Sequence, residues 1–226
     1  MAVSLFIARR YLFSKKSTNA INVISAISVV GVAVATMALV IVLSVFNGFH
    51  DLVASLFTAF DPQIEVVPAK GKDAPTDDPV LTQIKQLPEV DVATECVEDN
   101  ALVFYGDKQA MVTIKGVDNN FTQLTRINDL LYGDGEFALR AANLQYGVLG
   151  IRLAQQLGTG ARWNGFMRVF APNREGQFDI SNPTSGFVVD SLLSPGVVFS
   201  VRQAKYDQRY ILTSVSFARN LFGMQG

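Results

Sequence analysis

Residues 21–46 read INVISAISVVGVAVATMALVIVLSVF, and this stretch decides what class of protein the chain is. It contains no charged side chain, and none occurs between Lys16 and Asp51. At about 1.5 Å per residue, a helix of this length exceeds the ~30 Å hydrocarbon core of a bilayer. The sequence therefore predicts a transmembrane helix over residues 19–46.

The charges before this run indicate its orientation. The first sixteen residues carry no acid and four basic side chains, namely Arg9, Arg10, Lys15 and Lys16. Such a basic flank favours a cytoplasmic N-terminus, which places the chain after Asp51 on the far side of the membrane. Leu5, Ala8 and Leu12 fall on one helical face, so residues 1–18 are expected to form a cytoplasmic amphipathic segment. This segment either lies in the membrane interface or is an ordinary basic flank.

A cleaved signal peptide is the alternative to a retained anchor. Ala33-Val34-Ala35 fits the small-x-small pattern of a cleavage site. However, the apolar run continues as Met37 to Leu43, so cleavage there would leave a hydrophobic new N-terminus. We therefore expect the helix to be retained.

The apolar pattern continues beyond the predicted span. A seam with spacings of four, three, four, three and four residues is formed by Val42, Phe46, Phe49, Val53, Leu56 and Phe60. The spacing predicts a stalk helix over residues 47–60, which Asp61-Pro62 ends. The seam either packs against a partner helix or lines an apolar groove, or it docks on the surface of the chain's own domain.

Residues 61–226 are expected to form a periplasmic core domain of the α+β class, mixed and strand-rich. Strands are predicted at 63–67, from 90, at 101–105, 109–115, 166–171, 196–201 and 210–215. Gly106-Asp107-Lys108, between the strands at 101–105 and 109–115, predicts a hairpin. Helices are predicted at 79–87, 149–157 and 216–222, the last two ended by Gly158 and Gly223.

Composition excludes several function classes. Once the four basic residues of the N-terminus are set aside, fifteen basic residues face twenty acidic ones, so the remainder carries about −5. This charge gives no basic surface for nucleic acid. The single cysteine, Cys96, excludes an internal disulfide, and the single histidine, His50, argues against a His-rich metal site. No P-loop sequence is present, and no residue pattern argues for catalysis.

The order of short motifs along the chain resembles one transporter family. Ile7-Ala8-Arg9-Arg10-Tyr11-Leu12, Asn22-Val23-Ile24-Ser25 and Asn47-Gly48-Phe49 look like the opening of lipoprotein-releasing ABC transporter permeases of the LolC/LolE type, in the FtsX/MacB-like superfamily. Downstream, the resemblance continues in Ile114-Lys115-Gly116-Val117-Asp118, Gly150 to Gly158 and Tyr206-Asp207-Gln208-Arg209-Tyr210. Many members have Gly-Asp after the "L-A-x-x-L-G" helix, where this chain reads Gly160-Ala161.

The resemblance implies a four-helix permease with its large periplasmic domain between the first and second transmembrane helices. This chain then looks like the N-terminal half, without the C-terminal transmembrane helices. By resemblance, two permease subunits pair with a dimer of a separate cytoplasmic ATPase that binds ATP and Mg, and no cofactor is expected in this chain. The complex extracts lipoproteins from the inner membrane and passes them to a periplasmic carrier.

Candidate site residues follow from combining this resemblance with the apolar seam. The lipid or substrate path is expected along Val40, Leu43, Phe46, Phe49, Val53 and Leu56. Carrier contact is assigned to the hairpin tip, at Phe104, Tyr105, Gly106 and Asp107. The alternatives are a related permease that exports drugs or peptides or signals to periplasmic hydrolases, and a bitopic periplasmic binding module.

Overall fold

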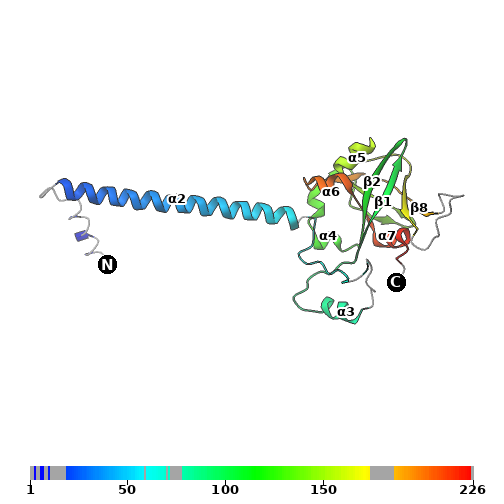
Figure 1. The fold of residues 1–226 in the computed structure, drawn as a ribbon, viewed down its shortest axis with the longest axis horizontal. Coiled ribbons are helices and arrows are strands. Elements are labelled where there is room, and N and C mark those ends of the chain that lie inside the picture. The colour runs from blue at the N-terminus through cyan, green and yellow to red at the C-terminus, as the bar shows by residue number, and fades with distance from the viewer. Residues whose placement is uncertain are drawn as a thin grey trace. The chain divides into compact units, whose positions relative to one another are not determined.

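The computed structural model describes residues 19–58, 60–69, 71, 78–173 and 186–224, with Val3, Phe6, Ile7 and Arg10 (Figure 1). The chain divides into two compact units, Met1–Ala54 and Ser55–Gly226. The predicted amphipathic face of Leu5, Ala8 and Leu12 lies outside the described residues.

A single helix, α2 (Asn19–Thr58), accounts for 40 residues of the chain. Its segment Val23–Val53 is long and apolar enough to cross a membrane, as predicted. Weakly polar residues are tolerated because their hydroxyls bond within the helix: Ser28 donates to the Ile24 carbonyl at 2.9 Å and Thr36 to Val32 at 2.8 Å. The helix ends at Thr58, two residues before the predicted limit.

The second unit is built on an eight-stranded mixed sheet with the order β3-β9-β6-β10-β2-β1-β7-β8. The predicted hairpin is confirmed as β1 (Cys96–Tyr105) and β2 (Lys108–Val117), which pair antiparallel from Cys96↔Val117 to Tyr105↔Lys108. The loop is two residues long, and Gly106 opens it with φ +57°. A positive φ at the first loop position is favourable for glycine and suits a tight hairpin.

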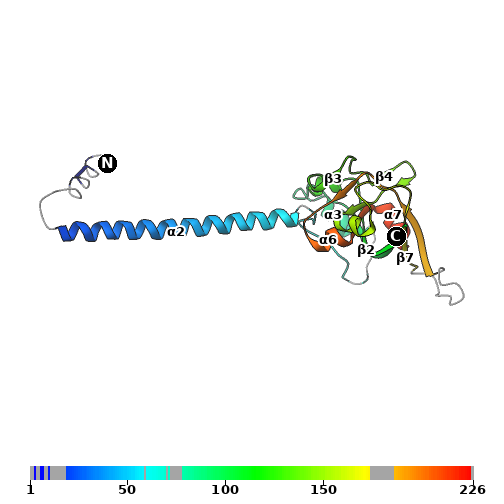
Figure 2. The same ribbon diagram turned by 90° about the horizontal axis from the view of Figure 1, so that it is seen from above.

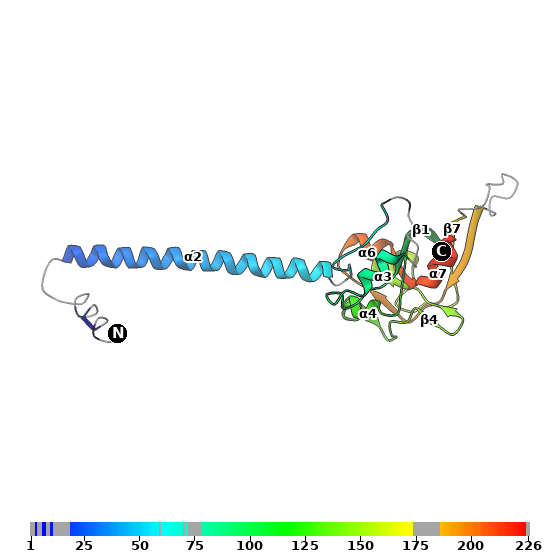
Figure 3. The same ribbon diagram turned by 90° about the horizontal axis from the view of Figure 1, so that it is seen from below.

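The remaining strands extend the sheet on both sides of this hairpin. They are β3 (Leu131–Gly133), β6 (Val148–Gly150), β7 (Met167–Pro172), β8 (Phe187–Leu192), β9 (Val197–Phe199) and β10 (Tyr210–Ser214). A separate small sheet pairs β4 (Arg140–Ala141) with β5 (Leu144–Gln145). Strand β10 runs parallel to β2 and antiparallel to β6. Figures 2 and 3 show that β8 extends beyond α7 at one edge of the sheet.

Short helices connect and cover the strands. They are α3 (Pro79–Lys85), α4 (Phe121–Leu124), the 3₁₀ turn η1 (Ile127–Leu130), α5 (Ile151–Leu157), α6 (Ala204–Arg209) and α7 (Val215–Phe222). The predicted glycine ends of α5 and α7 are confirmed, because Gly158 and Gly223 adopt left-handed φ values of +71° and +63°. The α+β class is therefore confirmed.

The sheet has a hydrophobic cluster on each face. One cluster joins alternate strand residues such as Val103, Ile114 and Ile211 to α5 and α7. The other contains Tyr210 and Leu212, the neighbours of Ile211 along β10. Successive side chains of a strand point to opposite faces, so β10 is buried along its whole length.

The predicted strand at 63–67 is wrong. Those residues belong to no strand, and Ile64, Val66 and Val67 are 82%, 60% and 67% exposed. The predicted strand start at Val90 is also wrong, since β1 begins at Cys96. Alternation alone does not make a strand when no neighbouring edge pairs with it.

Candidate functional site

The predicted lipid path lies mainly on α2. Val40, Leu43, Phe46 and Phe49 are exposed, with more than half of each side chain accessible. Val53 is half-buried, and the Leu56 side chain lies outside the described part of the structure. The helix thus presents an apolar surface along the predicted path.

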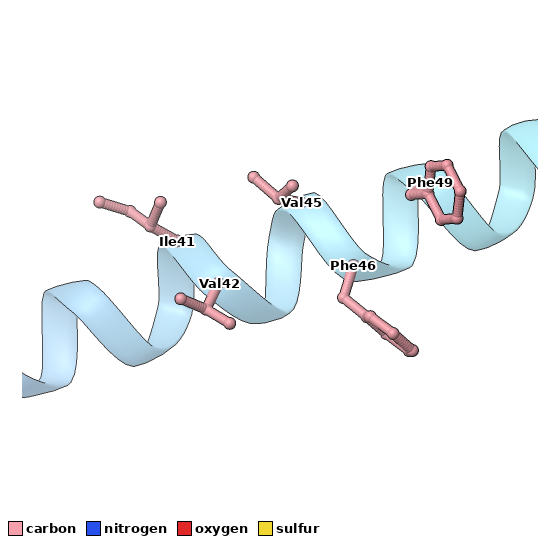
Figure 4. A pocket seen from close by; sticks show the side chains of 5 residues that line it. All are labelled: Ile41, Val42, Val45, Phe46 and Phe49. Carbon is pink, nitrogen blue, oxygen red and sulfur yellow. The ribbon is translucent and has the colours of Figure 1, made fainter.

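Figure 4 shows part of this surface, where Val42 and Phe46 point to one side of the helix and Ile41 and Val45 to the other. With Phe49, these side chains line a shallow hollow. All five residues come from one helix, so the hollow is a ridged helix surface and not an enclosed pocket. Such a surface suits lipid tails or a neighbouring helix.

The predicted carrier contact is only partly available at the hairpin tip. Gly106 and Asp107 are exposed. Phe104 is half-buried and packs edge-on against Phe170, with 5.0 Å between ring centroids. The Tyr105 hydroxyl donates to the Asn164 carbonyl at 3.2 Å. Two of the four predicted residues therefore support the hairpin, and two are free to meet a partner.

Phe60, near the start of the second unit, is surrounded by aromatic rings from later parts of the chain, and this group was not predicted. We call it the Phe60 cluster: Phe60, Phe121, Phe199, Tyr206 and Tyr210. The Phe60 ring is fully buried, with its centroid 4.6 Å from Tyr206, 5.2 Å from Phe199, 5.9 Å from Tyr210 and 6.5 Å from Phe121. The tilted and edge-on geometries are those that aromatic pairs prefer, each adding about 0.5–1.5 kcal/mol beyond burial.

Two tyrosine–carboxylate hydrogen bonds border the cluster. The Tyr206 hydroxyl donates to Asp61 Oδ2 at 2.6 Å, and the Tyr210 hydroxyl donates to Glu98 Oε1 at 2.7 Å. Burial raises the pKa of both tyrosines far above the ordinary value, and the bonds to Asp61 and Glu98 raise it further. Both hydroxyls therefore stay protonated and act as donors at any physiological pH.

A buried lysine completes the polar edge of the cluster. Lys115 is 7% exposed, and its Nζ lies 3.6 Å from Glu98 Oε2 and 5.3 Å from the Phe60 ring centroid. The ammonium thus has both a carboxylate and an aromatic face as partners. Cys96, the first residue of β1, is exposed.

A second hollow in the domain has a volume of about 260 Å³ and no charged lining residue. It is lined by Tyr132, Gly133, Ile151, Ala154, Gln155, Thr159, Gly160, Ala161 and Val198. Among the described residues, no group of His, Cys, Asp or Glu could hold a metal ion. The hollow therefore offers no charged side chain for acid–base chemistry, and the described residues offer no cluster of metal ligands.

The Phe60 cluster was not predicted from the sequence, although three of its residues had been noted for other reasons. Phe60 appeared as the last residue of a helical seam, and Tyr206 and Tyr210 appeared only as parts of a motif. The i, i+4 spacing of the two tyrosines was a usable signal. Their partner Phe60 lies 146 and 150 positions earlier in the chain, a separation that local periodicity does not reach.

Comparison with known proteins gives the family of the chain. No curated protein matches it. The family model of the MacB-like periplasmic core domain matches residues 25–180, which is more than half of the chain and includes Phe60 and the β1–β2 hairpin. This family is a component of ABC-transporter permeases, and an apolar helix followed by a mixed sheet fits that setting. The chain belongs to the MacB-like periplasmic core domain family.

Proposed function

We propose that the chain is a permease subunit of an ABC transporter that extracts lipoproteins from the inner membrane and delivers them to a periplasmic carrier. The family match supports the permease role. The motif order of the N-terminal segment supports the lipoprotein-releasing type.

The observation that carries this proposal is the length of the apolar surface on α2. The span Val23–Val53 contains 31 residues, all exposed up to Leu52. At about 1.5 Å per residue it is about 46 Å long, whereas the hydrocarbon core is ~30 Å thick. When the helix stands upright, roughly 15 Å of its length extends beyond the hydrocarbon; its outer end carries Phe46, Phe49 and Leu52 beside the polar Asn47, His50 and Asp51.

An apolar surface above the bilayer is what a departing acyl chain needs. Each methylene that leaves the hydrocarbon for water costs about 0.8 kcal/mol. Phe46 and Phe49, near the outer end of α2, offer large apolar faces that lower this cost during transfer. The remaining free energy comes from ATP hydrolysis on the separate ATPase.

The partners follow from this role. A second permease subunit supplies the other wall of the lipid path, an ATPase dimer binds on the cytoplasmic side, and the carrier docks on the periplasmic domain. Gly106 and Asp107 are our candidates for carrier contact, since both are exposed at the hairpin tip.

The test is reconstitution of the full-length complex, purified from its native membrane, in proteoliposomes that contain a triacylated lipoprotein. We expect ATP-dependent appearance of the lipoprotein on a soluble carrier, and none with a non-hydrolysable nucleotide. Copurification of a Walker-A ATPase is expected in the same preparation.

Two results would contradict the proposal. ATP-driven movement of a drug or peptide without lipoprotein release would make the chain an exporter of another substrate class. Absence of any ATPase from the purified protein would favour a bitopic binding module.

A further inference from the structure

We propose that α6 and the turn before it form a basic surface that binds the headgroup phosphates of anionic lipids in the outer leaflet of the membrane. This inference rests on the membrane setting of the proposed function. It goes beyond that function because it gives the periplasmic domain its own contact with the bilayer, in addition to the helix that spans it.

Three exposed basic side chains follow one another along this part of the chain. Arg202 lies in the turn after β9, and Lys205 and Arg209 lie in α6. Lys205 and Arg209 are four residues apart, so they share one face of the helix. Tyr206 and Asp207 are buried on the side that packs on the domain. The exposed residues of α6 therefore include two cations and no acid.

These cations have no carboxylate partner within the described parts of the domain. None of the ion pairs formed there includes Arg202, Lys205 or Arg209. Arg219 in α7, by contrast, is bonded to Glu95 at 2.8 Å. A surface cation without such a partner keeps its attraction for an anion outside the protein.

A buried carboxylate holds the turn that presents Arg202. Asp207 is 2% exposed, and its oxygens accept hydrogen bonds from the Val201 N–H at 2.8 Å and the Ser200 hydroxyl at 3.2 Å. Arg202 follows with φ +62°, a left-handed conformation that is uncommon and costly for a residue other than glycine. A ligand outside the domain explains why an exposed arginine is held in this conformation.

Helix α5 brings a fourth cation next to α6 (Figure 1). The two helices pack together, and Gly150 lies so close to Asp207 that a Cβ there would collide with the Asp207 backbone. Arg152, two residues after Gly150, is exposed, and no ion pair of the described residues includes it. Three of the four cations are thus arginines, whose planar donors bind phosphate in pairs.

The acids near α6 are largely engaged inside the domain. The carboxylates whose charge reaches Tyr206 are those of Asp61, Glu98 and Glu65. Asp61 accepts the hydrogen bond from Tyr206, and Glu98 is paired with Lys115 at 3.6 Å. The four exposed cations therefore form a local basic surface, although the chain after its basic N-terminus carries about −5.

The place of α6 relative to the chain suits a contact with headgroups. Tyr206 is bonded to Asp61, which is only eight residues beyond Val53, the end of the apolar span. Eight residues reach at most about 28 Å when extended and about 12 Å when helical. The headgroup layer itself extends about 5–8 Å beyond the hydrocarbon on each side. Chain length alone therefore keeps α6 within reach of the lipid phosphates.

The test places the full-length complex in nanodiscs of phosphatidylcholine, with or without one-third phosphatidylglycerol. A fluorophore is attached through Gln208→Cys in a Cys96→Ser background, and the lipids carry a quencher on their headgroups. We expect at least threefold stronger quenching in the anionic nanodiscs. High salt should remove the difference, because it screens exposed charges.

Charge reversal tests whether the named side chains are responsible. Lys205→Glu with Arg209→Glu should lower the anionic-to-neutral quenching ratio to below 1.5. The control, Arg140→Glu with Arg168→Glu, makes the same change of charge at two exposed residues outside α5 and α6 and should leave the ratio above 2. Lys205→Gln with Arg209→Gln removes the charges without adding new ones, and should also lower the ratio to below 1.5.

Equal quenching in the two kinds of nanodisc would overturn the inference, as would a wild-type ratio in both Lys205 and Arg209 double variants. Strong quenching in neutral and anionic lipid alike would assign the surface to another partner. The readout requires no transport, so it separates this inference from the proposed function. Lipid contact without lipoprotein release contradicts the proposed function alone, and lipoprotein release with equal quenching contradicts this inference alone.

Discussion

The hydroxyl of Tyr206 donates a 2.6 Å hydrogen bond to the carboxylate of Asp61, a residue 145 positions earlier in the chain. The bond joins helix α6 to the segment where α2 has just ended. It lies at the edge of the aromatic packing around Phe60. The segment after α2 is therefore held to α6 by a hydrogen bond at Asp61 and by ring packing at Phe60. The stability of the domain is therefore expected to respond to changes at Asp61 and Tyr206.

Replacement of Phe60 by alanine should destabilise the domain strongly. Removing a fully buried aromatic side chain typically costs about 3–5 kcal/mol. The control is Phe166→Ala, because Phe166 is 62% exposed and should lose less than about 0.5 kcal/mol. Denaturant unfolding followed by fluorescence measures both, and similar losses would mean that Phe60 is not part of the core.

Replacement of Gly116 by alanine should also be costly, for a different reason. A Cβ at this position of β2 would collide with the Cβ of Ala218 in α7 and lie 3.1 Å from the Ser214 carbonyl oxygen. Overpacking of this kind costs about 1–3 kcal/mol. Gly160→Ala is the matched control, since a Cβ there meets nothing within 4 Å. A melting temperature of Gly116→Ala equal to that of the control would show that α7 can move away freely.

Stability should fall as the pH rises above about 9. Burial and the bonds to Asp61 and Glu98 raise the pKa values of Tyr206 and Tyr210 above their ordinary range. Between the unfolded and folded pKa values, the unfolded chain loses protons that the folded chain keeps, so deprotonation favours unfolding. Urea unfolding at a series of pH values measures this loss, which should be absent below pH 8.

Transport should depend on the seam residues of α2 more than on the residues beside the seam. Phe46→Ser places a hydroxyl on the predicted lipid path and should lower lipoprotein release about tenfold with ATPase activity retained. Val45→Ser changes a similarly exposed residue outside the seam and should have less than a twofold effect. Equal effects would indicate that the helix contributes only general apolarity.

The fold could be predicted from the sequence where the signal was local. The charge-free run gives α2, and Gly106-Asp107 between two alternating segments gives the β1–β2 hairpin. The predicted glycine ends of α5 and α7 are confirmed for the same reason. In each case a few adjacent residues determine the backbone conformation.

The predictions failed where distant parts of the chain decide the outcome. Residues 63–67 have the alternation of a strand, but pairing depends on an available edge elsewhere. The seam spacing places Phe60 in line with the other apolar side chains, but it does not indicate which surface the ring packs against. The six-residue helix α6 is too short and polar to show a helical period, although it carries the Tyr206 side chain.

Strand β10 has a consequence for how the domain is made in the cell. It lies between β6 and β2, so the sheet has a gap in its middle until residues 210–214 have left the ribosome. By then α2 has long been synthesised and is available for membrane insertion. The domain must therefore complete its sheet late, through contacts of long sequence separation that form slowly. Until then the two half-sheets have unpaired strand edges, and such edges favour aggregation.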